Sequence, residues 1–298
     1  MNAQEKERIF QTKTELEDIL KNNPWNEAEI EAWQATLNAG KSGEFILKAD
    51  ADVIASYNRK CKKEKDLIQT HLLPQPFIGN PEAPIWILTQ NPGYSEIDLY
   101  DMLGKKEEIK DWWKKEKVVP REQTESKESL ENRQKLLLNQ LRFNKPSFYV
   151  LDDCFNTLKE HADNKSFGGY EWWNKRLLQC DLCNGRKDML SKFFVLEFFP
   201  YHSRNFSETL SKTEVAHSKF WKELVSYALN QKKLLLCRGK KVFEEIKKLP
   251  NAQNCMENIL FFISVQNVAV SSNNLISWSE LEKGKKQAAE LIKAELSR

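Results

Sequence analysis

Polar side chains that could carry chemistry follow directly after four short apolar runs of the sequence. These four polar segments are residues 89–95, 197–203, 237–241 and 270–277. They supply amides, hydroxyls, a carboxylate, an imidazole and cations, together with turn-forming residues. Gathered around one cleft, such groups could orient a water molecule, contact a polar ligand and stabilise negative charge that develops during a reaction.

The apolar runs before these segments predict the elements that must position them. The runs are 85–89, 193–199, 233–237 and 258–270. Helical patterns at 214–230 and 240–248 separate the later runs. Strands that alternate with helices indicate an α/β fold, and we expect a central, mostly parallel four-stranded sheet flanked by helices. Ligands of such sheets bind at the carboxyl ends of the strands, where the polar segments begin.

The rest of the chain is predicted to be largely helical. Amphipathic stretches occur at 5–21, 27–38 and 51–72. We therefore expect a helical extension at 1–74, packed on an α/β domain at 75–298. Residues 105–145 are charged and helical in composition, which favours an insertion within that domain. A last helix is expected over 279–296.

Composition and charge limit the classes of protein. The chain has 298 residues, 40% of them apolar, and a net charge of +3, which excludes a wholly disordered chain and a strongly basic nucleic-acid coat protein. The charge is uneven, because residues 1–50 are net acidic and residues 201–250 are net basic, so a basic face is possible. No run approaches the roughly 20 apolar residues of a membrane helix. Six scattered cysteines and the absence of a secretory signal indicate a soluble cytoplasmic protein.

Three further motifs have simpler interpretations. Gly40-Lys41-Ser42 imitates the end of a phosphate-binding loop, but it follows a helix and lacks the first glycine. Cys180 and Cys183 form a lone CxxC, without a second pair to complete a zinc site. The pair Trp172-Trp173 is interpreted as a core anchor, with stacking on a nucleobase as the alternative. We expect no metal and no cofactor.

The order of the polar segments resembles the uracil-DNA glycosylase superfamily. The segment Ile85–Ser95, which contains Thr89-Gln90-Asn91-Pro92-Gly93, is similar to that family's first motif. Leu196-Glu197 lies where the base-recognition strand ends, and Leu234–Gly239 resembles the third strand and its end. Ser271–Leu275 lies where the family's last loop enters the DNA minor groove. The resemblance covers roughly residues 75–278.

This resemblance implies a monofunctional DNA N-glycosylase, which flips a damaged or modified base out of the DNA and leaves an abasic site. DNA is the implied partner, with no membrane contact and no obligatory protein partner. The implied catalytic residues are Asn91, His202 and Asn273. The implied base-binding residues are Gln90, Tyr94, Glu197 and Phe199. The implied DNA-binding residues are Ser95, Arg238, Lys240, Lys241, Ser271, Ser272, Asn274 and Leu275.

Most of these residues have, besides the implied role, an alternative role in the structure alone. The amide oxygen of Asn91 would hold the attacking water, although Asn-Pro is also a common turn signal. Leu275 would fill the gap left by the flipped base. The aromatic side chains would stack on that base, or else belong to the core. Arg238 and the lysines at 240 and 241 would bind phosphate, or else form a solvated face.

Two residues depart from the family's pattern. Ser271 stands where the last motif begins with histidine. Glu197 replaces the expected amide, and an ionised carboxylate only accepts hydrogen bonds. It would repel O4 of uracil and suit the exocyclic amine of a cytosine-type base, or it would simply pair with a lysine or arginine.

Two functions of other classes remain open. One is a nucleic-acid-binding protein that has the glycosylase fold but no catalytic activity. The other is an unrelated α/β hydrolase that acts on a small molecule.

Overall fold

The computed structural model describes most of the chain outside a few segments. The described residues are 3–39, 43–93, 127–152, 155, 168–263, 269–271, 273–277 and 287–297. Tyr94, Ser95 and Ser272 lie outside them, as does the part of the expected insertion between 105 and 126.

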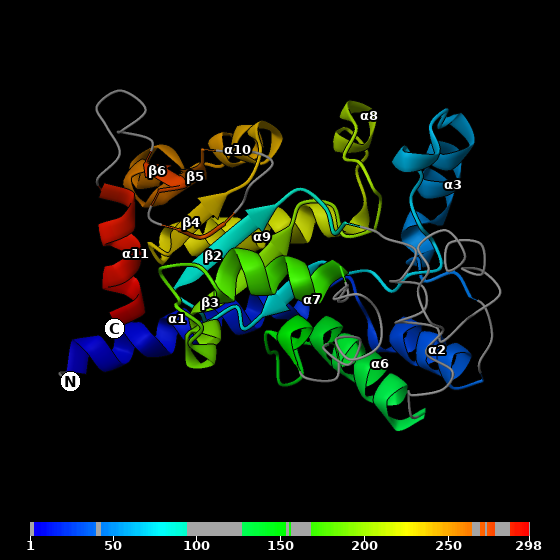
Figure 1. Ribbon diagram of the computed structural model, residues 1–298, viewed down its shortest axis with the longest axis horizontal. Helices are drawn as coiled ribbons and strands as arrows, with labels where there is room; N and C mark the ends of the chain where they lie inside the picture. Colours follow the sequence, from blue (N-terminus) through cyan, green and yellow to red (C-terminus); the bar gives the residue numbers. More distant parts are fainter. Residues whose placement is uncertain are drawn as a thin grey trace.

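A six-stranded mixed sheet forms the centre of the described fold (Figure 1). Its strands are β1 (Phe77–Gly79), β2 (Ile85–Thr89), β3 (Phe193–Glu197), β4 (Leu234–Cys237), β5 (Ile259–Phe262) and β6 (Leu275–Ser277). The spatial order is β1-β3-β2-β4-β5-β6. Strands β3, β2, β4 and β5 are parallel, whereas β1 and β6 pair antiparallel at the two edges.

The α/β class is therefore confirmed, but the expectation of a four-stranded sheet is wrong. All four apolar runs form the inner, parallel strands, because continuous apolar runs suit strands that are covered on both faces. The two edge strands have only three residues each. Strands that short have no periodicity to detect, and β6 lies within a segment that is rich in turn-forming residues.

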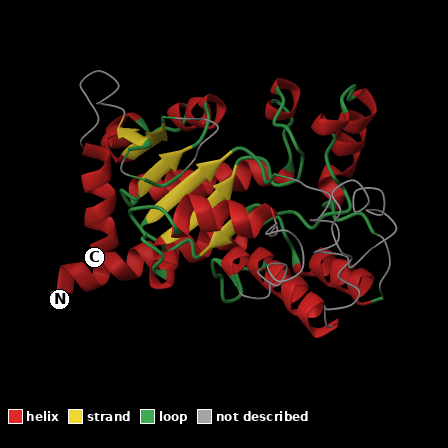
Figure 2. Cartoon of the chain, viewed as in Figure 1, coloured by secondary structure: helices red, strands yellow, loops and turns green. Residues whose placement is uncertain are grey.

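Helices cover both faces of the sheet (Figure 2). The helices are α1 (Ala3–Lys21), α2 (Glu27–Asn38), α3 (Ala51–Lys60), α6 (Lys127–Leu141), α7 (Gly168–Trp173), α8 (Glu208–Ser211), α9 (Ala216–Asn230), α10 (Lys240–Lys247) and α11 (Gln287–Ser297). A π-helical turn, η8 (Asn174–Leu178), continues α7. In the view of Figure 1, α7 lies in front of the sheet and α9 lies behind it.

Helix α3 is much shorter than the 51–72 stretch predicted. It ends at Lys60 because Asn58 fixes a return of the chain: its side chain donates to the carbonyl of Ile68 and accepts from the amide of the same residue. Local side-chain bonds of this kind compete with helix continuation.

Helix α6 lies within the range of the expected insertion, and one of its faces packs into the core. Helix α6 buries Leu137, Leu138 and Leu141. The buried side chain of Gln140 donates to the carbonyl of Gly79 and accepts from the amide of Ser147. These bonds tie α6 to the edge strand β1.

The helical region at 1–74 shares the apolar core of the sheet. Trp25 packs against Tyr201, with ring centroids 5.9 Å apart. The hydroxyl of Tyr201 donates to Asp50 at 2.7 Å and accepts from the amide of Leu47. The other oxygen of Asp50 accepts from the amide of Ala216, the first residue of α9. A carboxylate at that helix terminus is favourably placed.

Candidate functional site

The carboxyl ends of β2, β3 and β4 bring three of the four polar segments together. Thr89 and Glu197 are register partners at the ends of β2 and β3. Parallel pairing continues beyond them, because the amide of Phe199 donates to the carbonyl of Gln90. On the other side of β2, the amide of Arg238 donates to the carbonyl of Leu88. The chain passes from β2 to β3 on one side and returns to β4 on the other, which makes this edge a topological switch point.

Asn91 is held in one orientation by its amide group. Its Nδ2 donates to the carbonyl oxygens of Pro92 and Ser203, at 3.0 and 3.1 Å, and to the Ser203 hydroxyl at 3.0 Å. Carbonyl oxygens only accept, so the group that faces them must be the NH2. The amide oxygen therefore points elsewhere, and it makes no hydrogen bond within the described part of the chain.

Gln90 and Gly239 fix the spacing between the ends of β2 and β4. Gly239 precedes α10 and has φ +89°, a conformation that favours glycine. A Cβ on Gly239 would lie 2.5 Å from Nε2 of Gln90. The side chain of Gln90 thus rests directly on the backbone that begins α10.

Glu197 is buried at the centre of this edge, with 5% of its surface exposed. Burial raises its pKa to about 7, against the opposing influence of Thr89 and of the positive charge of Arg238. Among the described residues, Oε2 of Glu197 and Oγ1 of Thr89 have no hydrogen-bond partner of acceptable geometry. Near neutral pH both forms of the carboxyl are populated, so it is able to donate as well as accept.

Arg238 is half-buried and packs on an aromatic ring from another element. Its guanidinium carbon lies 5.4 Å from the ring centroid of Trp172 in α7. The guanidinium carbon of Arg176, in η8, lies 5.0 Å from the same centroid. Burial lowers the pKa of Arg238, and the positive charge of Arg176 acts in the same direction. We refer to Trp172, Arg176 and Arg238 as the arginine–tryptophan cluster.

Sequence reasoning missed Arg176. Trp172 packs against the core, as expected of the tryptophan pair, but its contacts with two guanidinium groups were not expected. Trp173 does anchor the core, packed edge-on against Phe148 with centroids 5.4 Å apart. Trp172, beside it, is only half-buried and carries the two guanidinium groups. The four-residue spacing of Trp172 and Arg176 was a weak signal, since helical residues four apart lie on one face.

His202 connects two loops through contacts with their backbone carbonyl oxygens. It is buried, and its Nδ1 and Nε2 lie 2.7 and 3.1 Å from the carbonyl oxygens of Gly93 and Leu73. Both ring nitrogens are therefore occupied by the backbone. The catalytic role expected of His202 is not supported by this geometry. Phe199, expected to stack on a base, is instead 1% exposed and packs against Tyr201.

The last polar segment is more buried than expected. Leu275 is fully buried in β6, so the prediction of an exposed leucine that enters DNA is wrong. Asn274 is also buried and donates to the carbonyl of Ala269. Ser271 is half-buried and its carbonyl accepts from the amide of Asn274. Asn273 is exposed, and the structure records no contact of its side chain within the described residues.

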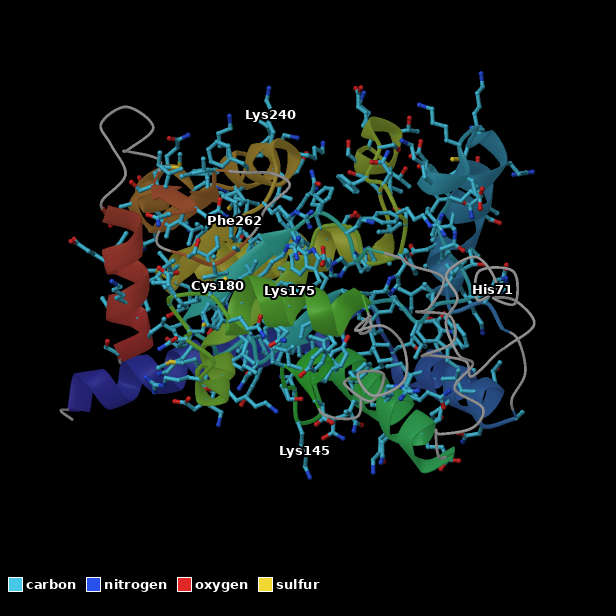
Figure 3. All side chains as sticks on the ribbon, in the orientation of Figure 1. His71, Lys145, Lys175, Cys180, Lys240 and Phe262 are labelled. Atoms are coloured by element: carbon cyan, nitrogen blue, oxygen red, sulfur yellow. The ribbon has the colours of Figure 1, made fainter. Side chains whose placement is uncertain are left out.

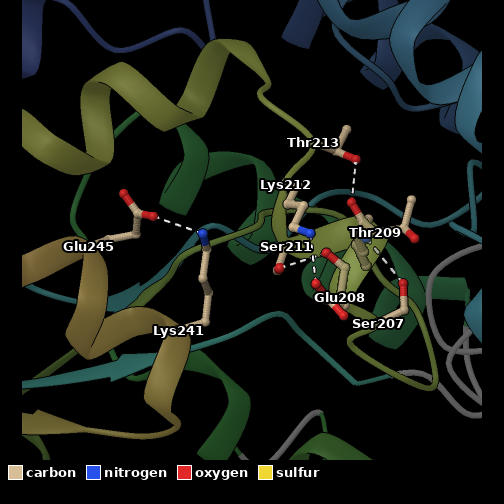
Figure 4. Close-up of polar contacts among 9 residues, drawn as sticks. Ser207, Glu208, Thr209, Ser211, Lys212, Thr213, Lys241 and Glu245 are labelled. Carbon is tan, nitrogen blue, oxygen red and sulfur yellow. Dashed lines mark hydrogen bonds and ion pairs between the residues drawn. The ribbon is translucent and has the colours of Figure 1, made fainter.

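The two lysines that begin α10 differ from each other. Lys240 is exposed and extends outward at the start of the helix (Figure 3). Lys241 forms an ion pair with Glu245 at 2.8 Å, one turn further along α10 (Figure 4). Only Lys240 is therefore free to meet an external anion, and the DNA-binding role expected of Lys241 is not supported.

Comparisons with known proteins give no match: no family model, no curated protein and no solved structure is similar to the chain. Within the described residues, no group of three histidine, cysteine, aspartate or glutamate side chains is placed to hold a metal ion. No helix of that part is long and apolar enough to cross a membrane.

Proposed function

We propose that the chain is a DNA N-glycosylase that removes a flipped-out base and leaves an abasic site. The observation that carries the proposal is the orientation of Asn91. Its NH2 group is bound by Pro92 and Ser203, and its oxygen, at the carboxyl end of β2, has no hydrogen-bond partner among the described residues. The buried carboxyl of Glu197 lies at the end of the neighbouring strand.

The proposed reaction adds one water molecule across the N-glycosidic bond. The amide oxygen of Asn91 accepts a hydrogen bond from the water and directs its oxygen toward C1′ of the sugar. The bond between C1′ and the base nitrogen breaks, and its electron pair leaves with the base. The hydroxyl remains on C1′, and the water's proton ends on the released base or in solvent. An amide orients the water without deprotonating it, so the step depends on stabilising the departing base.

Glu197 is the proposed reader of that base. In its ionised form the carboxylate accepts a hydrogen bond from an exocyclic amine, as on cytosine-type bases. In its protonated form it also donates, and can pair with a carbonyl oxygen such as O4 of uracil. Because the pKa of Glu197 is about 7, the preference between these bases should change near neutral pH.

The other residues proposed to contact the DNA substrate are as follows. Gln90 is a proposed base contact, and Arg238 and Lys240 are proposed phosphate contacts. Asn273 keeps its proposed place beside the substrate, because it is exposed on the segment that follows β5. Tyr94, Ser95 and Ser272 keep their predicted roles as proposals only, since they lie outside the described residues.

Substitution of Asn91 tests the catalytic role. Oligonucleotides that contain uracil, cytosine, modified cytosines or adenine are incubated with the protein, and alkaline cleavage reveals abasic sites. We expect Asn91→Ala to reduce base release about 100-fold or more, because the water loses its acceptor. Asn254→Ala, at an exposed asparagine outside the site, should retain the wild-type rate. Wild-type activity in Asn91→Ala would remove Asn91 from the mechanism.

The second candidate function is nucleic-acid binding without catalysis. It is favoured by the occupied ring nitrogens of His202 and by Ser271 at the position of the family's histidine. Salt-dependent DNA binding without abasic sites on any oligonucleotide would select it. The absence of DNA binding would instead favour a hydrolase that acts on small molecules.

A further inference from the structure

The arginine–tryptophan cluster places two cations on one aromatic ring. Within the described residues, neither Arg176 nor Arg238 forms an ion pair. Nε of each side chain is buried and has no acceptor. Two guanidinium groups on one ring repel each other, and buried donors without acceptors are costly. The fold holds both groups in place, so the cluster is able to bind an anion.

Glu197 does not supply that anion. It is the carboxylate that acts electrostatically on Arg238, yet the structure records no ion pair between the two side chains. Its own pKa is raised to about 7, so a large part of the population is uncharged near neutral pH. Glu197 therefore leaves hydrogen-bond donors of the two guanidinium groups for another acceptor.

The start of α10 adds further donors beside Arg238. Gly239 is the N-cap residue and forms no side-chain cap, so the first amides of α10 receive no acceptor from it. Free amides at a helix N-terminus favour anions, and phosphate groups in particular. Arginine forks match two oxygens of a phosphate at once. The ring of Trp172 holds the guanidinium groups without competing for their hydrogen bonds.

We propose that Arg176 and Arg238, packed on Trp172, bind one phosphate group at the carboxyl end of the sheet. The phosphate is either a phosphodiester of a nucleic-acid strand or the terminal phosphate of a mononucleotide. Its assignment to the DNA strand rests on the proposed function, whereas the site itself does not. The base of the same or a neighbouring nucleotide would then lie toward Glu197.

Thermal unfolding with added ligand tests the site without any catalytic readout. Inorganic phosphate is compared with chloride at equal ionic strength, since a ligand of the folded state raises the melting temperature. We expect phosphate to stabilise the wild type, and Arg176→Gln and Arg238→Gln to weaken its binding at least tenfold. Arg186→Gln removes the same charge from an exposed arginine paired with Asp188, and should bind phosphate as the wild type does.

Two outcomes would contradict the proposed phosphate site. One is the absence of any phosphate-specific stabilisation of the wild type. The other is an equal response in the wild type and in both cluster variants. If the glutamine variants do not unfold cooperatively, Arg176→Lys and Arg238→Lys are measured, which keep the charge but lose the fork. Weaker phosphate binding is expected there too, and unchanged binding would contradict the proposal.

Two further probes identify the source of the phosphate. Deoxyuridine 5′-monophosphate carries a terminal phosphate, and a single-stranded oligothymidylate without terminal phosphates carries only phosphodiesters. We expect the oligonucleotide to bind more tightly, with a salt dependence that decreases when either arginine is replaced. Tighter binding of the mononucleotide would retain the site but reject its assignment to DNA. If phosphate binds as expected but no oligonucleotide yields abasic sites, the phosphate site is retained and the glycosylase proposal fails. If abasic sites form but phosphate binding is the same in the wild type and in both cluster variants, the glycosylase proposal is retained and the phosphate site fails.

Discussion

At the scale of single residues, hydrogen-bond geometry distinguishes side chains that bind the backbone of a loop from side chains whose polar atoms could contact a ligand. The NH2 group of Asn91 binds the loop and its oxygen has no partner among the described residues, whereas both ring nitrogens of His202 contact backbone carbonyl oxygens. One oxygen of Glu197 has no hydrogen-bond partner among the described residues, although 95% of the surface of this residue is buried. A buried polar atom without a partner costs free energy, so its persistence suggests a functional role.

Glu197 should make the free energy of unfolding depend on pH. Its pKa in the folded protein is about 7, above the ordinary value of 4.5, so the folded state binds more protons between these values. The contribution of Glu197 to stability is therefore fully present below about pH 4.5 and is lost as pH rises toward 7. Glu197→Gln, which stays neutral, should gain on the order of 2 kcal/mol relative to the wild type between about pH 5 and about pH 8.

Urea unfolding at the two pH values measures this difference. The exposed Glu257 provides the matched control, because Glu257→Gln should show the same small effect at both. A stability difference between Glu197→Gln and the wild type that does not change with pH would show that the carboxyl ionises normally in the folded state.

At the scale of elements, the sheet edge is built by strand ends that contact each other directly. Gln90 follows β2 and lies on Gly239, which begins α10 after β4. The π-helical turn η8 contributes as well, because the carbonyl of Arg176 accepts from the amide of Val270 at 2.7 Å. That bond connects the arginine–tryptophan cluster to the segment after β5.

Gly239→Ala should disturb this edge for two separable reasons. An alanine there meets a φ of +89° and the side chain of Gln90, and we expect a loss of about 1–3 kcal/mol in the free energy of unfolding. The double variant Gln90→Ala/Gly239→Ala removes the collision but not the backbone strain, so it should recover part of the loss. Chemical denaturation measures both.

Gly93→Ala is the control for this substitution, because a Cβ at Gly93 meets nothing within 4 Å. We expect it to change stability by much less. Full recovery in the double variant would show that the backbone at residue 239 carries no strain.

At the scale of the whole molecule, the helical region at 1–74 and the sheet form one core. Asp50 joins them, since it accepts from Tyr201 after β3 and from the amide that begins α9. Burial raises the pKa of Asp50, while these two hydrogen bonds oppose that change.

Tyr201→Phe should destabilise the whole chain and not only its first helices. The variant removes the donor to Asp50 and the acceptor for the amide of Leu47, and we expect a loss of about 1–3 kcal/mol. Far-ultraviolet and near-ultraviolet circular dichroism should report one shared transition at a lower midpoint. Tyr227→Phe is the control, because Tyr227 is also a buried residue, and the structure records no hydrogen bond of its hydroxyl within the described residues. Separate transitions would show that the two regions unfold independently.

The local pattern of the sequence determined the four inner strands, the α/β class and the positions of the polar segments. These follow from runs of apolar residues and from turn-forming residues, which act over a few positions of the chain. The bounds of α2 and most of α9 and α10 follow for the same reason.

Only the tertiary structure decided which polar and apolar residues face the switch point. The burial of Leu275 and the meeting of Arg176 with Arg238 on Trp172 depend on segments far apart in the chain. The same holds for the raised pKa of Glu197, which burial causes. Contacts of this kind leave no periodic signal, because they arise from the packing of whole elements and not from the spacing of neighbouring residues.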